Sequence, residues 1–284
     1  MRVTFWGVRG SIPAPGREFN RYGGNTPCVA LHSESGALLV LDAGTGIIEL
    51  GNALIAQEFG KGEGSIDLFL THAHWDHIQG FPFFAPVYVP GNSLTIHGAS
   101  GSTGMLEGIF EGQMNPHYNP VQSLRNLGAT IAFAEAEEGV ATTIHGVEVT
   151  ARPNPHGQIS ALAYRFREGG RSLVYAPDAG YHDDWPSAET RELYRGADYL
   201  IHDCTYTPED RRGRESRGYC SIDIAARVAA ACQVKRLVMF HYDQDYTDEE
   251  VDRLAARCRE LLDEAPGGGD VELIAAREGL TLDV

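Results

Sequence analysis

Basic residues are scarce in this chain of 284 residues. Lysines and arginines number 23 against 39 aspartates and glutamates, so the formal net charge is −16. Such a charge argues against a large nucleic-acid footprint, because phosphate backbones are bound by basic surfaces. It leaves room for a small anionic substrate, since bound divalent ions reverse the local field wherever they lie.

Paired cysteines, long apolar runs and low-complexity segments are also missing. The five cysteines are widely spaced without a C-x-x-C pair, which argues against a disulfide scaffold and favours a reducing cytoplasm. No apolar run approaches the ~20 residues of a membrane-spanning helix, and the first residues lack the apolar core of a signal peptide. We therefore expect a cytoplasmic protein without a membrane partner, folded as one domain over residues 1–284.

Short apolar runs separated by turn residues dominate the chain and predict many strands. The expected strands are Val3–Val8, Pro27–His32, Ala37–Leu41, Ile66–Leu70, Leu94–His97, Ala129–Phe133, Val140–Ile144, Val147–Arg152, Ala161–Phe166, Ser172–Ala176, Tyr199–Ile201 and Leu237–Phe240. Helical spacing covers Thr45–Phe59, Ile222–Cys232 and Asp248–Leu262, and Thr247 with Glu250 forms a capping box before the last of these. Strands in both halves followed by helices predict an α/β fold, a four-layer αββα sandwich.

The most informative segment follows the strand at Ile66–Leu70 and reads Thr71-His72-Ala73-His74-Trp75-Asp76-His77. Four metal-binding side chains fall within six residues there, on a tight loop at a sheet edge. Imidazole favours zinc and similar ions, and carboxylate also binds harder ones. Four ligands are too many for one catalytic ion that keeps an open position. The loop therefore predicts two neighbouring ions, completed by ligands from later in the chain.

This loop resembles the signature of the metallo-β-lactamase superfamily, whose αββα architecture agrees with the strand pattern. Three ligand-type residues follow later strands at the positions of the superfamily's further motifs, namely His156, Asp178 and His241. The resemblance implies one ion held by His72, His74 and His156, a second held by Asp76, His77 and His241, and Asp178 as the bridge. The commonest lactamases carry cysteine at the bridging position. Aspartate there argues against antibiotic hydrolysis and favours Zn²⁺, with Mn²⁺ as the alternative.

The same resemblance implies a mechanism and a supporting acid. Two ions would share a hydroxide that attacks phosphorus or a carbonyl carbon, and Asp76 would orient that nucleophile. Asp42 lies where members of the superfamily place an acid behind the histidine loop. It either accepts an imidazole N–H or caps the helix that follows Thr45.

The segment Leu200-Ile201-His202-Asp203-Cys204-Thr205-Tyr206 resembles the His-Glu-Ala-Thr motif of the tRNase Z and related phosphodiesterase branch, with Asp for Glu and Cys for Ala. The histidine of that motif serves the leaving group, which makes His202 the candidate general acid. The alternative is a buried structural histidine at a strand end. Asp203 either orients His202 or contacts the site itself.

Two further segments are candidates for substrate contact. Phe5–Pro13 resembles the opening strand and glycine turn of these phosphodiesterases, and the next loop carries Arg21, Tyr22 and Asn25. That loop either binds phosphate or a base or is a solvated hairpin loop. The aromatic-rich segment Gly80–Pro120 is either a flap that holds a nucleobase or sugar, or core, or a dimer contact.

The Pro-x-Lys-x-Arg-Asn loop of tRNase Z is absent, and no long basic, glycine-rich arm is visible. We therefore predict a dinuclear metal-dependent phosphodiesterase that acts on small cyclic nucleotides or cyclic phosphates, with a homodimer expected by analogy. The alternatives are a metal-dependent thioesterase or acyl hydrolase of the glyoxalase II type, an RNA-processing nuclease, and a non-enzymatic binding or sensor module.

Overall fold

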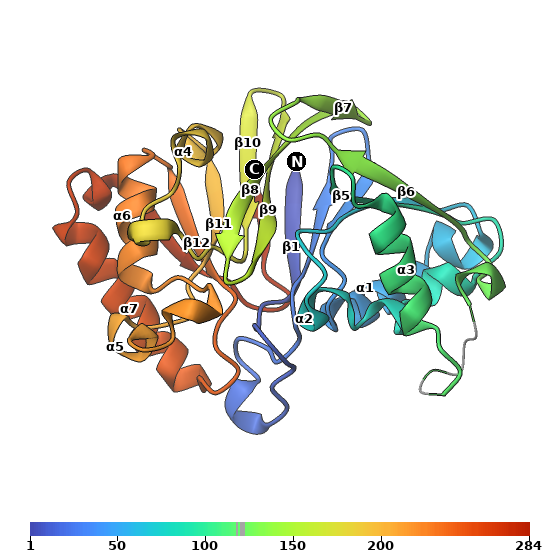
Figure 1. Ribbon diagram of the computed structural model, residues 1–284, viewed down its shortest axis with the longest axis horizontal. Helices are drawn as coiled ribbons and strands as arrows, with labels where there is room; N and C mark the ends of the chain where they lie inside the picture. The colour runs from blue at the N-terminus through green and yellow to red at the C-terminus, as the bar shows by residue number, and fades with distance from the viewer. Residues whose placement is uncertain (118, 120–122) are drawn as a thin grey trace.

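The computed structural model describes residues 1–117, 119 and 123–284, and shows two seven-stranded mixed sheets packed face to face with helices outside (Figure 1). The first sheet contains, in spatial order, β14 (Thr281–Asp283), β1 (Arg2–Gly7), β2 (Cys28–His32), β3 (Leu38–Leu41), β4 (Ser65–Phe69), β5 (Ser93–Ala99) and β6 (Thr130–Ala136). The second contains β13 (Glu272–Ala275), β12 (Arg236–Phe240), β11 (Tyr199–Asp203), β10 (Arg171–Ala176), β9 (Ile159–Glu168), β8 (Val147–His156) and β7 (Thr142–Ile144). The predicted four-layer sandwich is confirmed.

The helices divide between the halves in the same way. The first sheet is accompanied by α1 (Gly46–Ile55), α2 (Trp75–Ile78) and α3 (Thr103–Gln113), and the second by α4 (Ala188–Tyr194), α5 (Pro208–Arg211), α6 (Ile222–Ala231) and α7 (Asp248–Glu264) (Figure 1). The helix predicted at Thr45–Phe59 is shorter than expected, because α1 ends at Ile55 and a 3₁₀ turn, Glu58–Lys61, follows. The capping box before α7 is confirmed: the Glu250 N–H donates to Thr247 Oγ1 at 3.3 Å, and the Thr247 N–H donates to Glu250 Oε2 at 2.7 Å.

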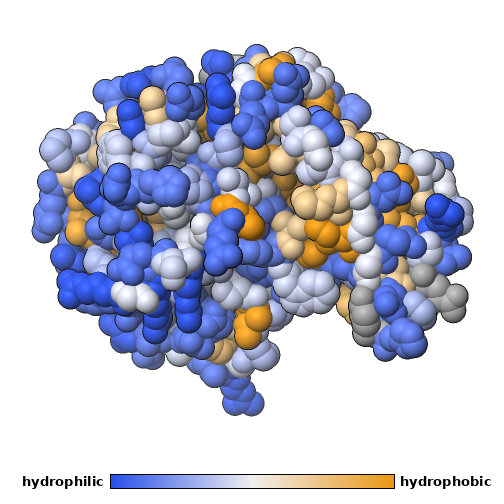
Figure 2. Space-filling model, in the orientation of Figure 1, coloured by the Kyte–Doolittle hydropathy of each residue, from blue (hydrophilic) through white to orange (hydrophobic). Residues whose placement is uncertain are grey.

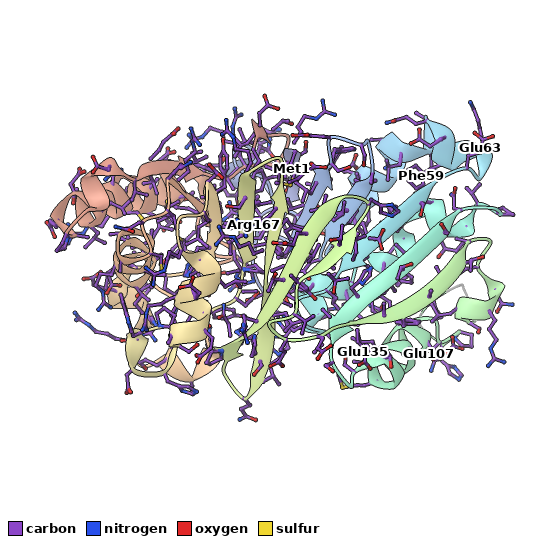
Figure 3. The ribbon with its side chains drawn as sticks, turned by 90° about the horizontal axis from the view of Figure 1, so that it is seen from above. Met1, Phe59, Glu63, Glu107, Glu135 and Arg167 are labelled. Atoms are coloured by element: carbon purple, nitrogen blue, oxygen red, sulfur yellow. The ribbon has the colours of Figure 1, made fainter. Side chains whose placement is uncertain are left out.

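Continuous apolar runs form the central strands because both faces of the first sheet are covered. On β3 and β4, Leu39 and Phe69 point into the core between the sheets, whereas Val40 and Leu68 belong to the core beneath α1 and α3. The termini meet at the boundary between the halves, where the Val284 N–H donates to Met1 O at 2.9 Å. Figure 3 shows Met1 at this boundary in the view from above.

Several strands run in the same direction, so their carboxyl ends lie at the same edge of the sandwich. Strands β3 and β4 pair in parallel, as do β10, β11 and β12, so their carboxyl ends share an edge within each sheet. Strand β8 has the same direction as β10, because two antiparallel pairings through β9 restore it. In Figure 1 this edge is the lower one, where α2 follows β4. Ligands placed directly after these strands therefore gather between the sheets.

The structure changes the interpretation of two segments. Strand β8 does not stop at Arg152 but continues to His156, so this histidine ends a strand instead of lying in a loop. Much of Gly80–Pro120 is core, since Phe81, Phe84 and Met114 are buried, although Phe83 and Met105 are 59% and 61% exposed. Tyr118 and Pro120, which the sequence placed in the same segment, lie outside the described residues.

All five cysteines are free and buried, which agrees with the predicted absence of a disulfide scaffold. Within the described ranges, none of the helices has both the length and the apolar character that crossing a membrane requires.

Candidate metal centre

The histidine loop is shaped by its first residue and by a single helical turn. The Thr71 N–H donates to Asp42 Oδ1 at 2.8 Å, which joins the loop to the end of β3. The His77 N–H then donates to His74 O at 3.0 Å and closes the turn that becomes α2. As a result His72 and His77 are buried, while His74 is exposed to solvent and places its Nδ1 3.0 Å from Nε2 of His156.

The loop and the three strand ends bring their ligand atoms together. Three overlapping groups have all their ligand atoms within 4.8 Å of one another: His72 with His74 and His156, His72 with His77 and Asp178, and Asp76 with His77 and His241. All seven residues expected from the sequence to hold metal are members of these groups.

Asp178 lies between the two sets of histidines. Its Oδ1 is 3.6 Å from His156 Nε2 and 3.4 Å from His241 Nε2, and its Oδ2 is 3.0 Å from His77 Nε2. Both carboxylate oxygens are buried without a hydrogen-bond partner in the described part of the chain, as are Nε2 of His72 and His77. Buried polar atoms are costly when unpaired. Four such atoms converging from imidazoles and a carboxylate fit divalent cations as their partners.

The charge states in the cluster also suit cation binding. Burial opposes ionisation of Asp76 and Asp178, but the imidazoles of His77 and His241 hold the pKa of both carboxyls well below the usual range. The acids are therefore carboxylates at neutral pH and present acceptor oxygens.

The histidines divide into two classes. Burial, with the neighbouring imidazoles, lowers the pKa of His72 and His74, so both are neutral and offer lone pairs. Burial also acts against charge on His241, but Asp178 and Asp76 outweigh it and raise its pKa to about 9. Burial likewise opposes charge on His77, but the carboxylates of Asp76, Asp42 and Asp178 outweigh it and raise its pKa. A cation bound beside these two would displace their protons.

Asp42 supports the first half of the cluster. The Nδ1–H of His77 donates to Asp42 Oδ2 at 2.8 Å, and the hydroxyl of Tyr175 donates to the same oxygen at 2.9 Å. This directs Nε2 of His77 toward the cluster and selects between the two roles considered for Asp42, since Thr45, not Asp42, is the N-cap of α1. Asp42 has φ 60°, a left-handed conformation that a non-glycine residue adopts at some cost.

Asp203 supports the second half indirectly. Its Oδ1 accepts from Thr205 Oγ1 at 2.7 Å, and that hydroxyl lies 3.1 Å from Nδ1 of His241. Burial and the negative charge of Asp178 raise the pKa of Asp203 to about 6. His241 itself has φ 60°. Asp203 thus reaches the cluster through Thr205 and does not orient His202 with its carboxylate.

His202 lies outside the cluster. It is fully buried, its Nε2 is 2.8 Å from the hydroxyl of Tyr181, and its Nδ1 donates to Asp203 O at 2.8 Å. Burial lowers its pKa to about 4, so it is neutral at physiological pH. Both ring nitrogens are engaged away from the ligands. The geometry therefore favours the structural alternative over the general acid predicted from the motif.

The loop residues predicted to bind substrate are also engaged elsewhere. Arg21 pairs with Asp252 of α7 at 2.6 Å, and the hydroxyl of Tyr22 donates to the same carboxylate at 2.8 Å. Asn25 donates from its backbone and side chain to Glu278, at 2.6 and 3.1 Å. These contacts join the loop to the second half of the molecule, so the substrate-binding role of Arg21, Tyr22 and Asn25 is not supported.

Three residues at the cluster were missed by the sequence analysis. The Ser11 N–H donates to Asp76 Oδ2 at 2.7 Å, and a Cβ on Gly10 would lie 2.2 Å from Cε1 of His241. The ring of Tyr219 lies 5.2 Å from that of His156 and 5.3 Å from that of His241. The glycine turn after β1 was a signal for the first two. Tyr219 had none, because it lies in a loop far from the metal motifs in sequence.

Comparison with known proteins agrees with this geometry. Residues 38–242 match the family model described as a beta-lactamase superfamily domain. Ribonuclease Z from Haloferax volcanii is 26% identical, in an alignment covering 100% of this chain and 95% of the relative. Zn²⁺-bound PqqB from Methylobacterium extorquens has a TM-score of 0.72 at 16% identity, with all of both chains covered. A diphosphatase of the PhnP family has a TM-score of 0.66 at 20% identity, covering 100% of this chain and 97% of that one.

The matched residues include the histidine loop and all three strand-end ligands. The chain belongs to the metallo-β-lactamase superfamily, in the branch that includes ribonuclease Z and the PhnP family.

Proposed function

We propose that this protein is a dinuclear metal-dependent phosphodiesterase that hydrolyses small cyclic nucleotides or cyclic phosphates. The observation that carries the proposal is the position of Asp178, whose oxygens lie between His156 of one donor group and His77 and His241 of the other. When bound, two divalent ions would supply Lewis-acid charge and lower the pKa of a coordinated water. The donors are imidazoles and carboxylates without a thiolate, a set that suits Zn²⁺ and also accepts Mn²⁺.

The protein's own residues would position the reacting groups. Asp76 Oδ2 is held by the Ser11 N–H at 2.7 Å and by His241 Nε2 at 3.2 Å. The other oxygen of Asp76 has no hydrogen-bond partner among the described residues and could accept a hydrogen bond from the attacking water and orient it. The Ser11 contact comes from the backbone of the loop after β1, so it would continue to orient the carboxylate when His241 Nε2 binds a cation.

Three observations support a small phosphate substrate. The relatives named ribonuclease Z and diphosphatase carry names that denote phosphate-linked substrates, which supports phosphoryl over acyl transfer. The alignment with the Haloferax ribonuclease is 343 positions long, so that relative carries insertions that this chain of 284 residues lacks. With a net charge of −16, the surface is poorly suited to a long RNA.

The test compares substrate classes on protein reconstituted with Zn²⁺ or Mn²⁺. We expect hydrolysis of bis-p-nitrophenyl phosphate and of members of a 2′,3′- and 3′,5′-cyclic nucleotide panel, and little hydrolysis of a glutathione thioester. His74→Ala should abolish this activity, whereas His117→Ala, which removes an exposed histidine outside the cluster, should not. Faster turnover of the thioester, or cleavage of precursor tRNA alone, would overturn the proposal.

A further inference from the structure

An arginine-rich segment stands out against the acidic composition of the chain. Four arginines fall within the seven positions 211–217, although the whole chain has only 23 basic residues. The segment connects α5 to α6 and leads directly into Gly218 and Tyr219. In Figure 1, α5 lies at the lower edge of the second half, the same edge at which α2 follows β4.

The end of this segment is pressed against the metal centre. The Nδ1–H of His156 donates to Gly218 O at 2.8 Å. Gly218 has φ 80°, a conformation that strains other residues, and a Cβ there would lie 2.0 Å from the backbone nitrogen of Gly157. Backbone conformation and lack of space therefore both require glycine here. Tyr219, the next residue, contacts the rings of His156 and His241. The segment is therefore held at a defined place beside the ligands.

Two of the arginines lie one aromatic ring farther out. The Arg217 Nη1–H donates to the hydroxyl of Tyr206 at 3.2 Å, and the guanidinium of Arg214 lies 5.5 Å from the centre of the same ring. Tyr206 is buried and meets Tyr219 edge to face, with ring centres 6.0 Å apart. The contacts thus lead from the metal ligands through Tyr219 and Tyr206 to two guanidinium groups.

The positive charge of this pair has no direct ion-pair partner within the described part of the protein, although the buried carboxyl of Asp243 interacts with both guanidinium groups at longer range. Arg214 and Arg217 are exposed, and neither is within ion-pair distance of a described carboxylate. Arg211 differs, because it pairs with Asp184 at 2.6 Å and donates to Tyr219 O at 3.0 Å, which braces the segment.

The acids of the segment are engaged locally. Asp210 accepts from the hydroxyl of Tyr246 and from Thr207 Oγ1, and Glu215 accepts from the backbone N–H of Gly213. They therefore occupy backbone and hydroxyl donors. Apart from the Arg217 Nη1–H that contacts Tyr206, the side-chain donors of the two outer guanidinium groups have no hydrogen-bond partner among the described residues and are open to an external anion.

Apolar side chains are also exposed beside the ligands. Ile12 and Trp75 are 54% and 58% exposed, and their neighbours Ser11 and Asp76 are hydrogen-bonded to each other. On the face drawn in Figure 2, hydrophilic residues predominate over the second half, and hydrophobic residues gather toward the centre and the first half. A ligand at the cluster would therefore meet both cationic and apolar groups.

We propose that Arg214 and Arg217, together with the hydroxyl of Tyr219, form a subsite for a second phosphate group of the substrate. The substrate class is then a nucleotide-like phosphodiester that also carries a phosphomonoester. Guanidinium groups bind phosphate through paired, charge-assisted hydrogen bonds, and a local cationic rim on an acidic protein would steer such an anion to the site. This inference rests on the proposed function.

The test uses two esters with one leaving group. Thymidine 5′-(p-nitrophenyl phosphate) and its 3′-phosphorylated form differ only in the second phosphate. Water adds to the 5′-phosphorus and the bond to p-nitrophenolate breaks in both. For the double variant Arg214→Gln/Arg217→Gln, we expect KM for the 3′-phosphorylated ester to rise about 10- to 100-fold, as two charge-assisted contacts are lost. Values for the other ester should stay within about twofold.

Arg167→Gln/Arg171→Gln is the matched control, because both side chains are 58% exposed at the end of the second sheet opposite the cluster. It removes the same two charges and should leave both KM values unchanged. An equal change for both esters in the double variant would overturn the subsite. Absence of hydrolysis of either ester by the unmodified protein would instead count against the proposed function.

A binding measurement decides the subsite without turnover. Calorimetry on the metal-loaded protein would compare thymidine 3′,5′-bisphosphate with thymidine 5′-monophosphate. We expect tighter binding of the bisphosphate and loss of that preference in the double variant. Equal affinities in the unmodified protein would overturn the inference even if the esters are hydrolysed.

Discussion

The two halves of the metal centre are built in different ways. The first half takes His72, His74, Asp76 and His77 from one loop after β4, whereas the second takes His156, Asp178 and His241 from the ends of three separate strands. The loop after β4 fixes its ligands by its own helical turn, in which the His77 N–H donates to His74 O. Strand-end ligands converge only because the directions of β8, β10 and β12 agree. The second half therefore depends on the integrity of the whole sheet.

The supporting acids show the same contrast on a smaller scale. Asp42 contacts its imidazole directly, with Oδ2 2.8 Å from Nδ1 of His77. Asp203 acts through the hydroxyl of Thr205, which lies 3.1 Å from Nδ1 of His241. Both arrangements direct Nε2 toward the cluster, but a direct carboxylate orients and polarises an imidazole more strongly than a hydroxyl does.

The largest expected loss of metal and of activity follows from replacing Asp178, whose carboxylate lies between the histidines of both halves. Asp178→Ala should lose both metal ions and lower activity by about 1,000-fold or more, because the carboxylate lies between both histidine sets. Metal content per chain and hydrolysis of bis-p-nitrophenyl phosphate are the measurements. Asp263→Ala, on the exposed side of α7, should retain two ions. Two ions per chain in Asp178→Ala would refute the bridge.

Replacing the two supporting acids compares direct with relayed support. Asp42→Asn should weaken metal binding about 10- to 100-fold, the usual range for such partners. Asp203→Asn should have a smaller effect, because its contact passes through Thr205 and because its pKa of about 6 leaves part of the group uncharged near neutrality. Titration with zinc against a chelator measures both. A larger loss for Asp203→Asn would reverse the comparison.

The hydroxyl of Thr205 can be tested by itself. Thr205→Val removes the hydroxyl while keeping the shape, and should weaken metal binding by about tenfold, the lower end of the range for such partners. Thr205→Ser keeps the hydroxyl and should restore most of the affinity. A loss of affinity in Thr205→Ser with none in Thr205→Val would show that packing of the methyl group, and not the hydrogen bond to His241, is what matters.

His202 should affect acid stability and not catalysis. Its folded pKa of about 4 lies below the ordinary value of 6.5. The unfolded chain therefore binds more protons between these values, and stability falls as pH decreases from about 6.5 to 4, by up to ~3 kcal/mol. His202→Asn should flatten this part of the curve of unfolding free energy against pH. The rate ratio between p-nitrophenyl and alkyl esters should stay unchanged, and a selective loss on alkyl esters would reinstate the general acid.

Much of this arrangement was predictable because its causes are local. The strand pattern predicted the sandwich, since period and burial follow from adjacent residues. The histidine loop and the strand-end ligands could be recognised as motifs. The motif alone could not decide the role of His202, because a strand-end histidine points either toward the edge or into the core, and the sequence does not distinguish the two.

Residue types and short spacings were enough to predict the fold class and the candidate metal ligands. Four further features could be seen only in the folded protein. Asp178 lies between the histidine sets, and His202 contacts Tyr181 and not the cluster. Arg21 pairs with α7, and Arg214 and Arg217 contact Tyr206 beside Tyr219. Each of these contacts joins residues that are distant in the chain. Strand pairing and the packing of the two sheets produce the contacts, and neither can be predicted from a short stretch of sequence.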